Sequence, residues 1–352
     1  MRLFISSFIA LVLTTALSCS GEPTVMMARP SGIPWSTEVP YQKHELDVRQ
    51  LAVSPDGTVL ATISADRVSL WRTADSGFIA SIEDVERLEF AQAVEVSNGG
   101  HHVAVLNEFY SLHLWDDTTH ASREVGMAYG QGPTALVGFI DEVLLWVSSD
   151  GALVAWTVED SHFATGARDI DNVGVVEGVG RAPDNQFVLW GARPEWVSVD
   201  AQGGLRVDSV DSFRSYDQLI DAPTPLNARW IFYPERAEVV AFDTLNDQSR
   251  ELTSEGPRAT SGAKDFISAL TLSTDGRWLA AAHASGAVEV WDSEERTLVG
   301  SFLVGERYVR AVFPRKVLDL RFGGGSLWVL LPEQTLLQVD PSDWTVVGRF
   351  EL

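Results

Sequence analysis

Cysteine is almost absent from this 352-residue chain, which contains a single one, Cys19. One cysteine cannot form a disulfide within the chain, so no disulfide framework is available to stabilise the fold. Positive charge is also scarce: 26 lysines and arginines stand against 49 aspartates and glutamates, a formal net charge of −23. A surface of this kind repels phosphates and anionic headgroups. We therefore expect neither general nucleic-acid binding nor electrostatic docking on a bilayer.

A long hydrophobic run is lacking as well. The apolar stretch Leu3–Leu17 follows Arg2 and has 15 residues, fewer than the roughly 20 that a transmembrane helix needs. Its length and its positive start are typical of a secretory signal peptide. Cys19 follows directly after it, and a lone cysteine at this place calls for an explanation.

The residues before this cysteine, Ala16-Leu17-Ser18-Cys19, resemble a bacterial lipobox. The resemblance implies that residues 1–18 are a lipoprotein-type signal peptide, that cleavage follows Ser18, and that Cys19 is lipidated. The match has Ala16 where that family prefers leucine. An ordinary signal peptide stays open as the alternative, because Ala16, Leu17 and Ser18 also fit a small-x-small cleavage site that would leave Cys19 a free thiol.

Residues 19–43 contain several prolines with interspersed Gly and Ser: Pro23, Pro30, Pro34 and Pro40. Such a composition is typical of an extended spacer. We expect residues 19–43 to form a tether and residues 44–352 to form the folded domain.

The sequence of the folded domain is an internal repeat. "VSPDGTVLATISADRVSLWR" (53–72) returns as "LSTDGRWLAAAHASGAVEVWD", and weaker copies lie between and after these two stretches. Each copy ends in an apolar residue that we call the end residue; five of the seven are followed by Asp. The end residues are Trp71, Trp115, Trp156, Val199, Phe242, Trp291 and Val339.

Successive end residues are 44, 41, 43, 43, 49 and 48 positions apart. Within a copy, short β-branched and apolar runs alternate with Gly, Asp, Asn and Ser, which indicates strands and turns. The first copy predicts four strands, near Val48–Ser54, Val59–Ser64, Val68–Trp71 and Phe78–Ile82. Four strands every 40–45 residues are typical of propeller blades. We predict an all-β fold, a seven-bladed β-propeller with four antiparallel strands per blade.

The two strongest copies resemble WD40 repeats. In the first copy the resemblance implies the family's structural hydrogen-bonded tetrad, matched by His44, Thr62, Asp66 and Trp71. In the sixth copy Ala263, Ala281 and Ser285 stand where the His, Ser/Thr and Asp would be. The C-terminal "DWTVVGRFEL" and residues 35–43 are both candidates for the outer strand of the last blade, so the mode of ring closure stays open.

Catalytic signatures are missing from the sequence. No Gly-x-Ser-x-Gly elbow occurs, and the glycine-rich "GMAYGQGPT" at 126–134 matches neither a P-loop nor a dinucleotide fingerprint. The adjacent His101 and His102 are expected to point to opposite faces of a strand, which does not suit a shared metal. We therefore expect no enzyme activity, no cofactor and no metal site.

The hypothesis from the sequence is a secreted, lipid-anchored propeller that serves as a non-enzymatic protein-binding platform at the bacterial cell envelope. Its partners would be proteins, together with the membrane through Cys19. The alternative is a periplasmic propeller enzyme of the quinoprotein or lactonase type, with its site in the central channel.

Overall fold

The computed structural model describes the folded domain strand by strand. The described residues are 48–64, 66–82, 91–107, 111–125, 133–140, 143–148, 153–158, 178–182, 186–190, 195–199, 205–209, 230–235, 238–243, 246, 248–252, 266–304, 317–332 and 334–352. The predicted signal peptide (1–18), the predicted tether (19–43) and His44 lie outside them.

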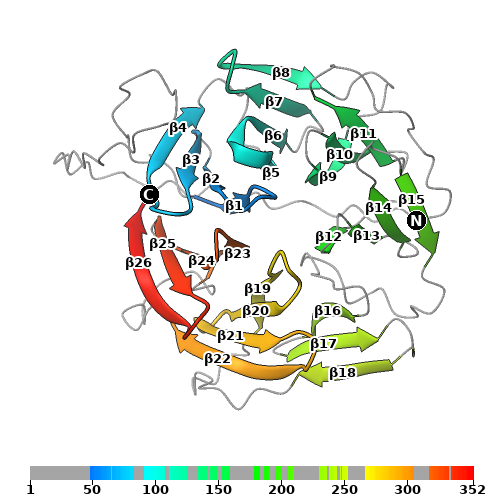
Figure 1. Cartoon of the computed structure of the whole chain (residues 1–352), viewed down its shortest axis with the longest axis vertical. Coiled ribbons are helices and arrows are strands. Elements are labelled where there is room, and N and C mark those ends of the chain that lie inside the picture. The colour runs from blue at the N-terminus through cyan, green and yellow to red at the C-terminus, as the bar shows by residue number, and fades with distance from the viewer. Residues whose placement is uncertain are drawn as a thin grey trace, which may run out of the picture.

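The described strands form seven antiparallel sheets in chain order, which we call blades one to seven (Figure 1). Blade one contains β1 (Gln50–Val53), β2 (Val59–Ile63), β3 (Val68–Arg72) and β4 (Phe78–Ile82). Blade two contains β5 (Ala91–Val96), β6 (His102–Asn107), β7 (Leu112–Asp116) and β8 (Ala121–Val125). Blade three contains, within the described residues, β9 (Pro133–Ile140), β10 (Val143–Ser148) and β11 (Leu153–Thr157).

The remaining four blades continue the pattern. Blade four contains β12 (Gly178–Ala182), β13 (Gln186–Trp190), β14 (Glu195–Val199) and β15 (Leu205–Ser209). The described strands of blade five are β16 (Trp230–Glu235), β17 (Glu238–Asp243) and β18 (Gln248–Leu252). Blade six contains β19 (Ile267–Leu272), β20 (Trp278–His283), β21 (Ala287–Asp292) and β22 (Thr297–Leu303). Blade seven contains β23 (Asp319–Gly323), β24 (Ser326–Leu331), β25 (Thr335–Asp340) and β26 (Thr345–Glu351).

The blades surround a common axis. The first strands of neighbouring blades contact one another: β1 lies against β5 and β23, β9 lies against β5 and β12, and β23 lies against β19. Figure 1 shows these strands nearest the centre and the fourth strands at the perimeter. Each end residue of the sequence repeat lies on a different sheet. Six lie on the third strand, and Phe242 lies on β17, which pairs with β16 and β18 as β21 pairs with β20 and β22. The predicted all-β propeller is confirmed, and the seven sheets of the described residues agree with the predicted count.

The core lies between the blades. The second strands β2 and β10 are buried along their whole length, and β6, β20 and β24 are buried at all but one residue, because each sheet packs on a neighbour through both faces. One apolar cluster joins blades one and two through Ala61, Leu70 and Val103. Another joins blades seven and one through Leu51, Trp71 and other residues, and it includes Leu352.

The repeated turn between the first and second strands has a physical explanation. In blade one the Ser54 hydroxyl accepts a hydrogen bond from the Val59 N–H at 2.9 Å and donates one to Asp56. In blade six Ser273 and Asp275 make the same contacts around the turn to Trp278. Gly57 adopts a φ of +70° and lies against the backbone of Gly324 in blade seven, where a Cβ would approach a backbone nitrogen to 2.7 Å. A side chain at Gly57 would therefore be both strained and obstructed.

The aspartate that follows many end residues caps the next turn. Asp292 accepts hydrogen bonds from the N–H groups of Glu294 and Glu295. The turn then closes on Arg296, which donates its N–H to the Asp292 carbonyl and has a φ of +60°. The same turn is built by Asp116 with His120 in blade two and by Asp340 with Trp344 in blade seven. These Asx turns explain why aspartate follows five of the seven end residues.

The sequence left open which end of the chain provides the outer strand of blade seven, and the structure shows the C-terminal strand in that place. β26, from the C-terminal "DWTVVGRFEL", pairs with β25 as the outer strand of blade seven. The seam to blade one is joined by Asp319, whose Oδ2 accepts the Leu51 N–H at 3.0 Å and whose Oδ1 accepts from Arg321 at 2.9 Å. Burial raises the pKa of the Asp319 carboxyl, against the lowering effects of Arg321 and of the Leu51 and Leu320 N–H groups.

Candidate functional site

The first repeat supplies part of the predicted tetrad. Trp71 on β3 donates its indole N–H to the Thr62 hydroxyl on β2 at 3.0 Å, and both side chains are buried. Asp66 accepts hydrogen bonds from the Ser64 hydroxyl and, at 2.8 Å, from Arg67 Nε. His44 lies outside the described residues. The structure thus brings Thr62 and Trp71 together, while the tetrad as a whole stays a prediction.

The sixth repeat places different groups at the same positions. Trp291 occupies the place of Trp71, and Ala281 occupies the place of Thr62, as the strand registers show. The indole N–H of Trp291 is buried and, within the part of the chain that the structure describes, has no hydrogen-bond partner. Two positions further along the strand, His283 Nε2 lies 3.1 Å from Glu289 Oε2, with side chains only 2% and 3% exposed. A buried polar pair has therefore been placed where blade one has Ser64 and Ser69.

These positions form a series around the ring. Each end residue pairs with one residue of the second strand. Four positions further along the chain from that paired residue, four blades have a buried polar residue: Ser64, Asn107, Ser148 and His283. On the third strand, Ser69, His113 and Glu289 are likewise buried and polar. All of them lie near the connection between the second and third strands. That end of the ring, which we call the 2–3 face, therefore has a buried polar layer beneath it.

Sequence reasoning named Thr62 but did not identify this layer. A signal was present in the sequence: Asn107, Ser148 and His283 each lie eight positions before their end residue, and Ser64 lies seven before its own, so one column forms once a one-residue gap is allowed. Their burial was not available, because single polar residues near turns are usually exposed. Buried polar groups require partners, and Asn107 Oδ1, for example, accepts the Ser111 N–H at 3.0 Å across the connection.

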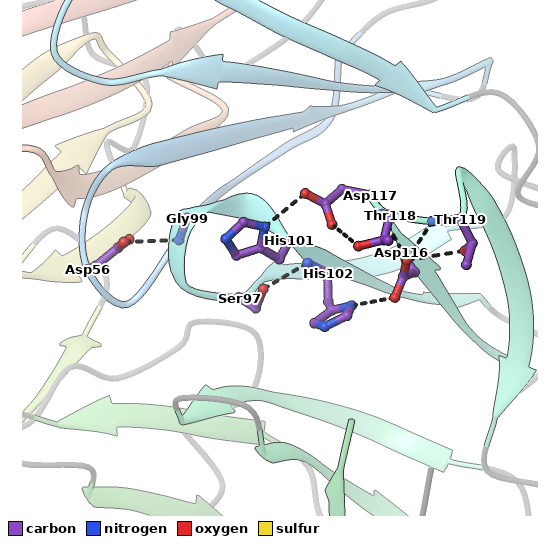
Figure 2. A network of polar contacts seen from close by, with 9 residues as sticks. All are labelled: Asp56, Ser97, Gly99, His101, His102, Asp116, Asp117, Thr118 and Thr119. Atoms are coloured by element: carbon purple, nitrogen blue, oxygen red, sulfur yellow. Dashed lines mark hydrogen bonds and ion pairs between the residues drawn. The ribbon is translucent and has the colours of Figure 1, made fainter. Parts of the chain in front are cut away.

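The opposite end of the ring carries a polar network between blades one and two (Figure 2). Asp56 accepts the Gly99 N–H at 3.0 Å and donates its own N–H to Asn98, so the turn of one blade is tied to the turn of the next. Partial burial raises the pKa of Asp56, but hydrogen bonds from Ser54, Thr58 and Gly99 outweigh it and hold the pKa below its ordinary value.

Two histidines in this network face two different carboxylates. His101 Nδ1 lies 2.8 Å from Asp117 and His102 Nδ1 lies 3.6 Å from Asp116, and Figure 2 shows the two rings apart from each other. Asp116 is held in turn by the N–H groups of Thr118 and Thr119. Across the part of the chain that the structure describes, no group of three potential metal ligands comes together.

The comparisons with known proteins agree with this geometry. The family description "WD domain, G-beta repeat" matches residues 36–71 and 256–292, which cover the first and sixth repeats as far as their end residues. No curated protein sequence matches the chain. The matched segments end at Trp71 and one residue past Trp291, so the two strongest copies are the stretches that match this repeat description.

Solved structures of low sequence identity share the fold. The WD40 repeats of RRP9 are similar with a TM-score of 0.58 at 15% identity, over 83% of this chain and 89% of that one. Kluyveromyces lactis Hsv2 is similar with a TM-score of 0.54 at 12% identity, over 87% and 99%. The computationally designed Ika8 protein has a TM-score of 0.54 at 16% identity, over 88% of each chain. The chain is a WD40-like β-propeller.

The class fits the rest of the geometry. WD40 repeats serve as protein-interaction platforms, and the 2–3 face is built from connections held on rigid strands, where binding residues are commonly found. Among the described residues, none lies in a helix of the length and hydropathy that crossing a membrane requires.

Proposed function

We propose that this chain is an exported, lipid-anchored WD40-like propeller that binds protein partners through its 2–3 face and has no catalytic activity. The observation that carries the proposal is the pair of WD40 repeats at 36–71 and 256–292, within a ring whose 2–3 face has a buried polar layer beneath it. A rigid ring that presents connections from several blades is suited to recognition. Function still resides in the site and not in the fold alone.

The location in the proposal rests on the sequence. Cys19 follows an apolar stretch of signal-peptide length, and lipidation there would hold the propeller at the cell envelope. A lipid anchor suits the net charge of −23, because the anchor needs no basic patch to stay bound when more than one chain is attached.

The test is crosslinking in intact cells with the native chain and with Cys19→Ala, followed by affinity capture and mass spectrometry. We expect a stoichiometric protein partner with the native chain and its loss with the variant. Labelling with radioactive palmitate checks the anchor itself, since only the native chain should incorporate label. No stoichiometric partner with either chain would contradict the platform.

The alternative enzyme has its own readout. A propeller of the quinoprotein or lactonase type would contain a bound metal or quinone, so metal analysis and an absorbance scan of the purified protein decide the point. Stoichiometric Ca²⁺ or a quinone absorption band would contradict the non-enzymatic platform and support the enzyme.

A further inference from the structure

A pocket lies at the perimeter between blades five and six. Its volume is about 300 Å³, and it is lined by Trp230, Asp243, Asn246, Gln248, Ser249, Arg250 and Arg296. Trp230 and Arg250 come from β16 and β18, and Arg296 comes from the turn between β21 and β22. Figure 1 shows β17 and β18 beside β21 and β22 at the outer edge of the ring.

The boundary between blades six and seven has different residues at the corresponding positions. In blade seven the turn residue Trp344, which corresponds to Arg296, reaches back to blade six and packs edge-to-face on Trp278 with ring centroids 5.6 Å apart. Trp278 corresponds to Trp230, since each pairs with the aspartate after its end residue. The indole of Trp344 lies against Gly300, where a Cβ would approach it to 2.2 Å. That boundary is closed by apolar packing.

Between blades five and six, arginines stand at both of these positions. Arg296 stands for Trp344, and its guanidinium carbon lies 4.3 Å from the centre of the Trp230 ring. Arg250 stands for Gly300, because the two pair with corresponding residues of their third strands. The exchange of an indole and a glycine for two arginines removes the apolar filling and leaves a charged cavity.

The two guanidinium groups are available for a ligand. Among the described residues, neither forms a hydrogen bond or an ion pair, and Arg296 Nε is buried without an acceptor. The carboxylate of Asp243 is 4% exposed and accepts a hydrogen bond from Asn246 Nδ2 at 2.8 Å. The lining thus carries two positive charges against one negative charge, in a chain of net charge −23.

We propose that this pocket binds a carboxylate of a partner protein, on an acidic side chain or a C-terminal residue. The proposal deepens the proposed function by naming the chemistry of the partner and a second contact surface at the perimeter. Arginine forks bind planar carboxylates in a bidentate way, and the volume is at the lower end of the range for ligand pockets. A carboxylate is favoured over a phosphate because the buried Asp243 and the net charge of the chain repel a dianion more strongly than a monoanion.

The experiment measures fluorescence anisotropy of a labelled hexaglutamate peptide, with hexaglutamine as the neutral probe, at about 0.15 M salt to screen long-range repulsion. We expect saturable binding of hexaglutamate to the native chain and none of hexaglutamine. Arg250→Gln and Arg296→Gln should each weaken binding by about tenfold or more. The double variant Arg250→Gly with Arg296→Trp copies the closed boundary and should abolish binding.

Arg277→Gln is the matched control. Arg277 is also stacked on a tryptophan, with its guanidinium carbon 4.2 Å from the Trp278 ring centre, but it is 63% exposed and lies outside the pocket. This variant should bind hexaglutamate as the native chain does. Thermal unfolding of all variants checks that the ring is intact.

Three results would overturn the proposal: no saturable binding, equal weakening by Arg277→Gln, or tight binding of a phosphoserine hexapeptide where hexaglutamate fails. Failure of the carboxylate pocket can be distinguished from failure of the protein-binding platform. If cells yield a partner that Arg250→Gln and Arg296→Gln variants retain, the platform stands and the carboxylate pocket is wrong. If hexaglutamate binds and cells yield no partner, the pocket binds carboxylates as proposed and the platform is wrong.

Discussion

The first and sixth repeats are the two most similar stretches of the chain, and they differ in the buried polar groups between their second and third strands. Both build the same Ser–Asp turn and bury a tryptophan at the end position. In the first repeat the indole N–H of Trp71 donates a hydrogen bond to Thr62. In the sixth repeat Ala281 stands at the position of Thr62, and the indole N–H of Trp291 has no hydrogen-bond partner among the described residues. The sixth repeat instead contains the buried pair of His283 and Glu289. Turn chemistry therefore defines the blade, and the polar groups between strands vary from blade to blade.

The largest effect is expected from breaking the pair in blade six. Glu289→Ala leaves the His283 imidazole buried without its carboxylate, so we expect the free energy of unfolding to fall by about 3 kcal/mol. The double variant His283→Leu with Glu289→Leu replaces both polar groups and should cost much less. Urea denaturation measures both. A double variant as damaging as the single one would show that packing, and not polar pairing, is what the site provides.

The next effect concerns blade one. Thr62→Val removes the acceptor of the Trp71 indole N–H and leaves a buried donor unpaired, which should lower the free energy of unfolding by about 1–2 kcal/mol. Thr62→Ser keeps a hydroxyl at the same place and is the control. Chemical denaturation followed by tryptophan fluorescence provides the measurement. Equal losses for the two substitutions would contradict the role assigned to the hydrogen bond.

The reverse experiment makes blade six resemble blade one. Ala281→Ser offers the Trp291 indole an acceptor in the place that Thr62 occupies, so we expect a gain of about 0.5–1 kcal/mol. The same substitution at Ala280, which is equally buried and points to the other face of β20, provides the control and should be destabilising. A loss of stability from Ala281→Ser would mean that the space beside Trp291 does not admit a hydroxyl.

The smallest effects separate the two carboxylates that tie blade one to its neighbours. The raised pKa of Asp319 means that its stabilising contribution is complete below its unfolded value of 3.8 and is lost as pH rises through the folded value. The lowered pKa of Asp56 has the opposite consequence, a contribution present above 3.8 and lost as pH falls through the folded value.

Their pH dependence is measured by difference. The free energy of unfolding of the native chain minus that of Asp319→Asn should decrease as pH rises above 3.8, whereas the same difference for Asp56→Asn should increase up to that pH. Denaturation curves across this range give both differences. Slopes of the same sign would contradict the assignment of burial at Asp319 and of hydrogen bonding at Asp56.

Much of the fold could be predicted from the sequence because the repeat has local causes. The predicted strand Val59–Ser64 differs from β2 by one residue, and Phe78–Ile82 is β4 itself, since turn residues bound each apolar run. The aspartate after the end residue was also recognised. Its role was not, because an Asx turn appears only once the backbone around it is placed.

The site was less predictable, for a physical reason. Whether Ser64 and His283 are buried depends on how blades pack against each other, and this packing involves residues more than 40 positions apart, as the repeat spacing shows. The pocket between blades five and six depends on a strand register that aligns Arg250 with Gly300, although the two lie eight and nine positions after their end residues. Arg296 and Trp344 both lie five positions after their end residues, but this spacing does not show that Arg296 stacks on Trp230.

The most direct test of the platform is photo-crosslinking in cells from defined positions on the two ends of the ring. Benzoylphenylalanine at Ser285, in the connection between β20 and β21, probes the 2–3 face, and the same group at Asp275 in the repeated turn probes the opposite end. The account predicts a discrete adduct with one partner from Ser285 and none from Asp275. Adducts from Asp275 alone, or from neither position, would contradict it.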